Sequence, residues 1–139
     1  MPQTHARLEF NHAMIYTTKL TRSLKFYRDA LGFEVVAGYP GAYVRLKSPA
    51  GNTTIALHAV EPGQEMQPSA EGLRLYFEVR HLDGFCRALE AKGVKLDQAP
   101  QEMPWGWRHA YLRDPDGHEI SLYWAGKARF TKSAVPDKL

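Results

Sequence analysis

The feature that most constrains the fold is an internal repeat with an interval of 62 residues. Residues 12–35 hold an alternating apolar and polar segment, an apolar stripe with helical spacing, and then a glycine. Residues 74–97 hold the same signals in the same order, so that His12 corresponds to Arg74. A segment that recurs in this way is one supersecondary unit present twice, and it sets the fold class.

Each half is expected to form one helix and four strands. In the first half Thr21 offers an N-cap hydroxyl, and the apolar stripe predicts a helix over about residues 22–31. In the second half Asp83 is the expected N-cap, and Gly93 is the residue at which the helix ends. An alternating strand precedes each helix, and three shorter strands follow it. The sequence therefore predicts an α+β fold of two βαβββ modules.

The boundaries of the modules follow from the same signals. They are expected at about residues 8–60 and 72–124, within one domain that spans residues 1–125. The segment between them, residues 60–72, is rich in Pro, Gly and polar residues, which is typical of a linker. Residues 126–139 are expected to form a basic tail.

Charge and composition narrow the possible partners. The net charge is +3, but the Lys and Arg residues are scattered, so we expect no nucleic-acid binding and a preference for small anions. No apolar run approaches the ~18–20 residues that cross a membrane, and the start of the chain lacks a long apolar segment. The single cysteine, Cys86, lies on a helical apolar stripe and is expected to be a core thiol. Together these features predict a cytoplasmic protein.

Two such halves, with Leu31-Gly32-Phe33 after the first helix and Asp114-Pro115-Asp116-Gly117-His118 before the last strand, resemble the vicinal oxygen chelate superfamily. This is the group of glyoxalases, bleomycin-resistance proteins and extradiol dioxygenases. The resemblance covers residues 8–124 and implies a half-open barrel around a small-molecule cavity, often completed by a second subunit. A homodimer is also expected because each half exposes a sheet edge. The fold alone does not give the chemistry.

Metal-dependent members of this superfamily place His, Glu or Gln ligands on the first, fourth, fifth and eighth strands. The residues of this chain at those positions are His12, Ala56, Arg74 and Ser121. Arginine stays protonated and cannot coordinate a cation, and Glu119 lies ~6.6 Å along the strand from the position of Ser121. We therefore expect no metal site and no cofactor. The alternative is a divalent ion that His12 and His58 hold together with water.

The candidate ligand contacts are side chains that alternation turns toward the expected cavity, with two tryptophans beside it. They are His58, Arg74, Tyr76, Trp105, Trp107, Ser121 and Tyr123. Arg74 offers a guanidinium fork that matches a carboxylate, or it forms an ion pair with Glu78 or Glu119. The tryptophans flank a glycine, which suits a lid over a planar ligand, or alternatively a cap on the core or on a dimer contact.

The candidate catalytic residues are His12 and Tyr111. A cavity histidine titrates near neutral pH, and Tyr111 precedes Ser121 by a spacing similar to that of the acid–base tyrosine in extradiol dioxygenases. The alternatives are a structural histidine and a tyrosine of the cavity wall. His118 is expected to fix the turn in which it lies. The remaining histidines, expected at the surface or in turns, are His5, His81 and His109.

These residues leave three functions open. The first is a metal-free protein that binds a small anionic or aromatic ligand; cationic drugs of the bleomycin type suit this positively charged chain poorly. The second is an enzyme, either a metal-dependent lyase, isomerase or dioxygenase with an atypical site, or an acid–base catalyst that uses His12 and Tyr111. The third is a partner-binding subunit with a vestigial cavity.

Overall fold

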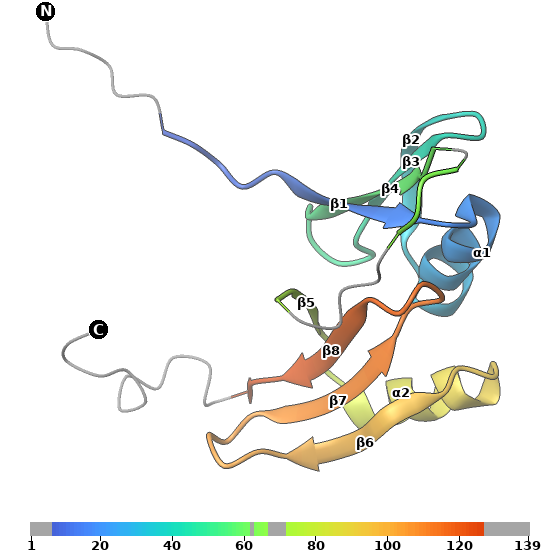
Figure 1. Ribbon diagram of the computed structural model, residues 1–139. Helices are drawn as coiled ribbons and strands as arrows, with labels where there is room; N and C mark the ends of the chain where they lie inside the picture. Colours follow the sequence, from blue (N-terminus) through green and yellow to red (C-terminus); the bar gives the residue numbers. More distant parts are fainter. Residues whose placement is uncertain (1–6, 62, 67–71, 127–139) are drawn as a thin grey trace, which may run out of the picture. The chain divides into compact units, whose positions relative to one another are not determined.

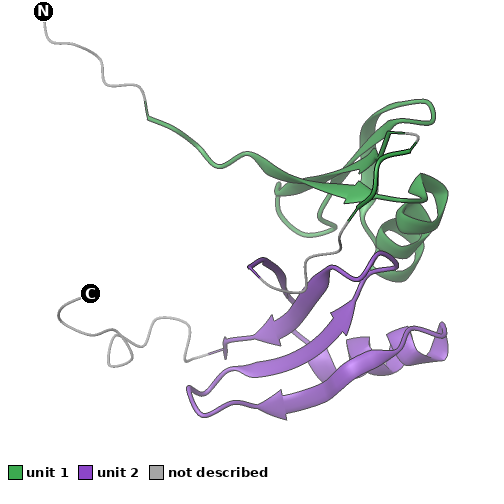
Figure 2. Ribbon diagram, viewed as in Figure 1, with its two compact units in different colours: residues 1–66 green, residues 67–139 purple. Residues whose placement is uncertain are grey.

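The structure is a computed structural model that describes residues 7–61, 63–66 and 72–126. The chain divides into two compact units, Met1–Met66 and Gln67–Leu139 (Figure 2). The division falls within the segment predicted to be a linker. Three of the predictions concern residues that lie wholly or partly outside the described ranges: His5, part of that linker, and residues 127–139 of the predicted tail.

The first unit is one helix and a four-stranded sheet. Its elements in chain order are β1 (His12–Thr17), α1 (Leu20–Lys25), η1 (Phe26–Ala30), β2 (Glu34–Tyr39), β3 (Tyr43–Lys47) and β4 (Thr54–Ala59) (Figure 1). The strand order in the sheet is β1-β4-β3-β2. Strand β1 runs parallel to β4, and the other neighbours are antiparallel. The first and last strands of the module are thus neighbours, and β1 and β2 form the two edges of the sheet.

The second unit repeats this arrangement. Its elements are β5 (Arg74–Glu78), α2 (Leu82–Ala91), β6 (Leu96–Glu102), β7 (Arg108–Arg113) and β8 (Glu119–Trp124). The strand order is β5-β8-β7-β6, again with the first strand parallel to the last. The α+β class and the two βαβββ modules are therefore confirmed. The half-open barrel and its cavity stay predictions.

Both helices begin earlier than predicted. Helix α1 begins at Leu20, so that Thr21 lies in its first turn instead of at the N-cap. The hydroxyl of the buried Thr17 accepts the N–H of Lys19 (3.2 Å) and is hydrogen-bonded to Ser23 Oγ (2.6 Å), which ties the start of the helix to the end of β1. Helix α2 begins at Leu82. Asp83 is therefore not the N-cap but lies in the first turn of the helix, where its carboxylate accepts hydrogen bonds from Arg108 of strand β7.

The far ends of the helices agree with the prediction. Helix α1 continues as a wider π-helical turn, η1, and Gly32 follows with φ +86°. Gly93 has φ +88° two residues after helix α2. A left-handed backbone of this kind carries no penalty for glycine, which is why these positions end the helices.

The helix-facing sides of both sheets form the cores. In the first unit these buried apolar residues are Ile15, Tyr27, Leu31, Phe33, Leu46, Ile55 and Leu57, while Ala56 is buried on the opposite face of the sheet. In the second unit they are Leu82, Cys86, Leu89, Ala110, Leu112, Ile120, Leu122 and Ala125. Cys86 is 1% exposed, and burial raises the pKa of its thiol to about 11. The burial of Cys86 confirms the prediction of a core thiol. A thiol that stays protonated near neutral pH is also a poor nucleophile.

The turn before β8 is held by Asp114. Its Oδ1 accepts the backbone N–H groups of Asp116 and His118 (both 2.9 Å). Its Oδ2 accepts the Nδ1–H of His118 at 2.7 Å. The predicted role of His118 in fixing this turn is confirmed, and Gly117 supplies the positive φ (+91°) that the turn needs.

A pH-dependent stability is expected from His118. The hydrogen bond to Asp114 raises the pKa of His118 above its usual 6.5. Its stabilisation is therefore complete below pH ~6.5 and is lost as the pH rises through the folded-state pKa. We predict that His118→Asn lowers the free energy of unfolding by about 1–2 kcal/mol at pH 5.5 and by less at pH 9, measured by urea denaturation.

The exposed His81 provides the matched control. His81→Asn is expected to change the free energy of unfolding little at either pH. An equal loss for His118→Asn at both pH values would contradict the charged pair.

Candidate functional site

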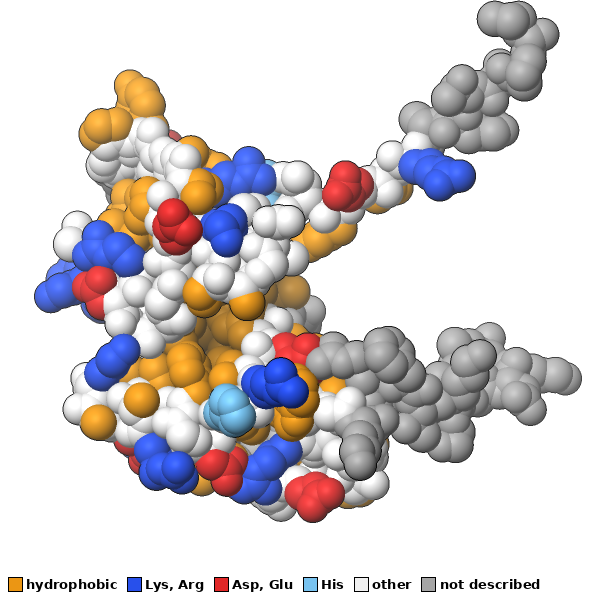
Figure 3. Space-filling view, turned by 180° about the vertical axis from the view of Figure 1, so that it is seen from behind, with side chains coloured by type: hydrophobic (Ala, Val, Ile, Leu, Met, Phe, Trp, Pro, Cys, Tyr) orange, Lys and Arg blue, Asp and Glu red, His pale blue; other side chains and the backbone are white. Residues whose placement is uncertain are grey.

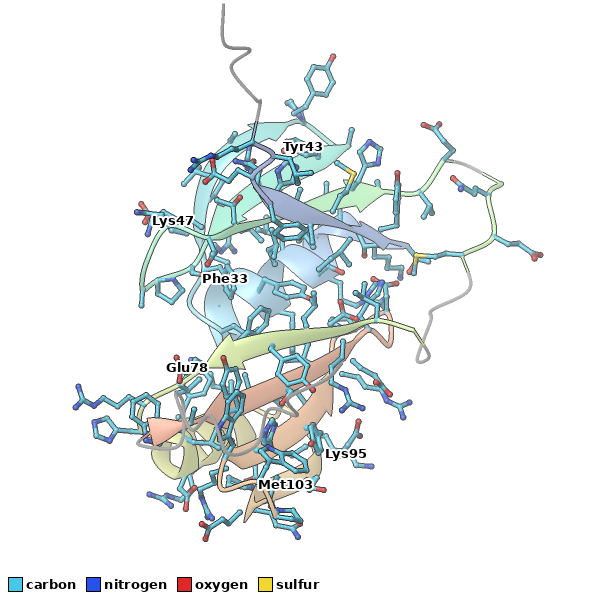
Figure 4. All side chains as sticks on the ribbon, turned by 90° about the vertical axis from the view of Figure 1, so that its left-hand side faces the viewer. Phe33, Tyr43, Lys47, Glu78, Lys95 and Met103 are labelled. Carbon is cyan, nitrogen blue, oxygen red and sulfur yellow. The ribbon has the colours of Figure 1, made fainter. Side chains whose placement is uncertain are left out.

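The candidate site lies on the face of the second sheet opposite helix α2. Strand register places Tyr76 beside Ser121, and Ser121 beside Tyr111. One step along, His109 of β7 pairs with Tyr123 of β8. Because side chains alternate between faces, all of these point away from the buried Ile120 and Leu122 side of the sheet. Figure 4 shows the side chains of both units, with Glu78 labelled at the end of β5.

Aromatic rings surround the imidazole of His109 on this face. Trp107 and Tyr123 stack nearly parallel to it, with ring centroids 6.2 and 5.6 Å away. Tyr76 and Trp105 meet it edge to face at 6.0 and 5.5 Å. The fifth surrounding ring is that of Tyr111, at 5.7 Å. His109 and these five residues together are called the aromatic cluster.

The tight β6–β7 turn holds the two tryptophans of the cluster. The backbone N–H of Met103 donates to the carbonyl of Trp107 (2.8 Å), and the N–H of Gly106 donates to the carbonyl of Met103 (2.9 Å). Met103 is labelled at this turn in Figure 4. Gly106 has φ +92°, which leaves Trp105 half-exposed at the tip of the turn. The predicted position of both rings beside other candidate ligand contacts agrees with this geometry.

The prediction for the position of His109 is wrong. It was expected at the surface or in a turn, but it lies within β7 and is 2% exposed. Its Nδ1 is 2.7 Å from the Oγ of Ser121, and its Nε2 is buried with no hydrogen-bond partner among the described residues. Burial is the main cause that lowers the pKa of His109, and the positive charge of Arg74 lowers it further. The imidazole is therefore neutral near pH 7.

Ser121 is completely buried on the same face. Ser121 occupies the position at which metal-dependent members of the superfamily carry a carboxylate ligand, and here its hydroxyl is hydrogen-bonded to the imidazole of His109. The signal that would have located His109 is its alternation with Tyr111, two residues further along β7.

Arg74 forms the ion pair that was one of its two predicted roles. Its Nε and Nη2 donate to Oε2 of Glu119 at 3.1 and 2.9 Å, so that Glu119 is the partner in this ion pair. The guanidinium carbon also lies 4.8 Å from the centroid of the Tyr111 ring. The hydrogen bond to Glu119 raises the pKa of Arg74, so the guanidinium stays charged. A cation thus lies on one side of the aromatic cluster.

A hollow of about 250 Å³ opens at the end of the sheet where β5 and β8 begin. Its polar lining includes Arg74, Asp97, Gln98, Tyr111, Arg113 and Glu119. The amide nitrogen of Gln98 is buried there without a hydrogen-bond partner among the described residues. The volume lies below the ~300–1,000 Å³ of drug-sized ligand sites.

The candidate residues of the first unit do not gather in the same way. His12 Nδ1 lies 2.7 Å from Asn11 Oδ1 and 3.2 Å from Nη2 of Arg45. His58 bonds to the carbonyl of Ala59 (2.6 Å) and lies beside Tyr16, with ring centroids 5.6 Å apart. His12 pairs with Thr54 in the register, four residues before His58. The two histidines are thus roughly 13 Å apart along the strands, too far to share one ion.

The residues at the four superfamily ligand positions do not fit a divalent ion. Ala56 has no donor atom, and Arg74 is a cation already bonded to Glu119. Ser121 is bonded to His109, and His12 lies beside the positive Arg45. Among the described residues, no three His, Cys, Asp or Glu side chains gather in a way that would hold a metal.

Lys and Arg side chains form no continuous stripe on the face shown in Figure 3, where they are interspersed with Asp and Glu. Within the part of the chain that the structure describes, no helix is long and apolar enough to cross a membrane.

Comparison with known proteins agrees with this fold. The model of the Glyoxalase/Bleomycin resistance protein/Dioxygenase superfamily matches residues 9–122. The uncharacterized protein YraH of Bacillus subtilis (strain 168) is 30% identical over 112 residues, which cover 73% of this chain and 87% of that protein. The chain belongs to this superfamily, as its resemblance to the vicinal oxygen chelate proteins predicted.

Solved structures share the same architecture. A glyoxalase/bleomycin resistance protein/dioxygenase from Nocardioides has a TM-score of 0.71 at 22% identity, covering 87% of this chain and 85% of that one. A superfamily member from Sphaerobacter thermophilus DSM 20745 has a TM-score of 0.69 at 27% identity, covering 84% and 98%. Lactoylglutathione lyase from Agrobacterium tumefaciens has a TM-score of 0.68 at 20% identity, covering 86% and 96%. The first and third likenesses show the fold alone.

The exposure of the Arg74–Glu119 pair gives a prediction about stability. The two side chains are 37% and 23% exposed, and ion pairs of this kind contribute about 0–1 kcal/mol. Arg74→Ala is therefore expected to leave the melting temperature nearly unchanged in a calorimetric scan. Leu122→Ala, which empties a core position, should cost about 2–5 kcal/mol and shows that the scan is sensitive. A loss for Arg74→Ala as large as that for Leu122→Ala would make Arg74 a structural residue.

Proposed function

We propose that this protein binds a small planar aromatic molecule with an acidic group, and that the molecule lies against the aromatic cluster of the second unit. The observation that carries the proposal is the gathering of predicted contacts on one face of one sheet. Besides His109, the face brings together Arg74, Tyr76, Trp105, Trp107, Tyr111, Ser121 and Tyr123.

The exposure of the rings supports an aromatic ligand. Tyr76 is 52% exposed and Trp105 is 50% exposed, although each is a large side chain with much apolar surface. Aromatic pairs in stacked or edge-to-face geometry contribute about 0.5–1.5 kcal/mol beyond the area that they bury. A planar ligand that inserts between these rings gains that energy from several contacts at once.

The charge near the cluster supports an acidic group over a basic one. The guanidinium carbon of Arg74 lies 4.8 Å from the centroid of the Tyr111 ring, and its Nε and Nη2 donate to Glu119. Tyr76 is a further side-chain hydrogen-bond partner of Arg74, so a ligand carboxylate would share the five guanidinium N–H groups with Glu119 and Tyr76. Glu119 offsets part of the positive charge, so we expect a moderate preference for acids and not a strong one.

A matched ligand series tests the proposal. Benzoate, benzamide and benzamidinium share one ring and differ in charge. Isothermal titration calorimetry is expected to show the tightest binding for benzoate, about tenfold or ~1.4 kcal/mol tighter than benzamidinium. Arg74→Ala should remove this order without abolishing binding of the neutral amide.

Tyr76→Ser tests the contribution of the rings, and Tyr39→Ser is its control because Tyr39 is an exposed tyrosine of β2 in the other unit. Only Tyr76→Ser should weaken binding of all three compounds. Equal binding by both variants would contradict the proposed face. Elemental analysis is a separate test of the proposed function. A stoichiometric metal that is lost in His12→Ala would contradict the proposal, because it would favour a metal-dependent enzyme of the superfamily.

A further inference from the structure

The imidazole of His109 has one satisfied nitrogen and one unsatisfied nitrogen. Nδ1 lies 2.7 Å from Ser121 Oγ, and both side chains are buried, with exposures of 2% and 0%. Nε2 has less than 1 Å² of exposed surface and no partner among the residues that the structure describes. Buried polar atoms are paired in the great majority of native proteins, so an orphan at the centre of an aromatic cluster needs an explanation.

The hydroxyl of Ser121 decides which nitrogen carries the proton. A neutral imidazole has one N–H, and Ser121 has one O–H whose only partner within the described chain is His109. If Nδ1 carried the proton, the hydroxyl hydrogen and the Nε2 lone pair would both be left without partners. If Ser121 donates to Nδ1, the proton sits on Nε2, and a single buried donor remains. The second arrangement leaves fewer polar groups unsatisfied and is the favoured one.

We propose that the Nε2–H of His109 is the group that selects the ligand, by donating a hydrogen bond to a carbonyl or other oxygen acceptor on an aromatic molecule. This inference rests on the proposed function, since it concerns the same face of the second sheet. Ser121 is a positioning residue, because it acts on the ligand through the tautomer of His109. The ligand oxygen accepts the hydrogen bond that this buried N–H does not make within the described chain.

Access to Nε2 requires one ring of the cluster to move. Trp107 and Tyr123 stack on His109 and on each other, with their own centroids 5.2 Å apart. Trp105 is half-exposed at the tip of a turn that contains Gly106, and it meets His109 by an edge. Trp105 is thus the ring that swings aside with least disturbance of the sheet, and the ligand ring replaces it.

A pair of isosteric ligands measures the selection directly. 4-Acetylbenzoate and 4-ethylbenzoate share the ring and the carboxylate, and they differ in one ketone oxygen. We expect wild-type protein to bind the ketone about tenfold more tightly in calorimetry, since the buried donor is satisfied only by that ligand. Binding of both compounds with equal affinity would overturn the role of His109 and leave the proposed aromatic site intact. Binding of neither would count against the proposed function itself.

Variants assign the selection to His109. His109→Phe keeps a ring in the stack and removes both nitrogens, so the preference for the ketone should disappear while 4-ethylbenzoate still binds. Ser121→Ala should reduce the preference, because Nδ1 is then free to take the proton. His81→Phe is the control at an exposed histidine and should keep the full preference. A preference that survives in His109→Phe would contradict the inference.

The tautomer can be measured without any ligand. Two-dimensional ¹H–¹⁵N spectra that correlate ring nitrogens with ring carbon-bound protons distinguish the two neutral tautomers and the imidazolium. At pH 7 we expect His109 of the wild-type protein to be the Nε2–H tautomer and to become a mixture in Ser121→Ala. An Nδ1–H tautomer or an imidazolium in wild-type protein would overturn the assignment, whatever the binding experiments show.

Discussion

The site depends on the hydrogen bond between Ser121 and His109 across neighbouring strands. It occupies the centre of a sheet face, where the strands β8 and β7 bring a hydroxyl and an imidazole together at 2.7 Å. Burial within the aromatic cluster keeps the imidazole neutral, and the hydroxyl satisfies one of its nitrogens. Nε2 of His109 is then a buried polar atom without a hydrogen-bond partner among the described residues, within a face rich in aromatic rings. Apolar and aromatic walls with a few polar groups are typical of small-molecule sites.

The fold could be read from the sequence because its signals are local and occur twice. The interval between His12 and Arg74 matches the starts of β1 and β5 in the structure. The glycines that end the helices were located correctly, since a left-handed backbone is a strong local requirement. The starts of the helices were misplaced. Their first turns are fixed by contacts with strands, such as Thr17 with Ser23 and Asp83 with Arg108, which spacing alone does not reveal.

Most residues of the candidate site were predicted from the sequence, but His109 at its centre was not. Alternation correctly put Tyr76, Ser121 and Tyr123 on one face, because register within a sheet follows the two-residue period. His109 was assigned to the surface since a lone histidine near a loop gives no sign of the rings that will cover it. For Arg74 the sequence offered an ion pair or a ligand contact, and the structure shows an ion pair with Glu119. Such choices depend on tertiary distances, which a sequence pattern does not contain.

A crystal structure of the protein with 4-acetylbenzoate tests the central claim most directly. The account predicts a ketone oxygen about 2.7–3.2 Å from Nε2 of His109, with Trp105 displaced from its edge contact. A ligand held on the first unit, or one that lies against the cluster with its oxygen turned away from His109, would contradict it.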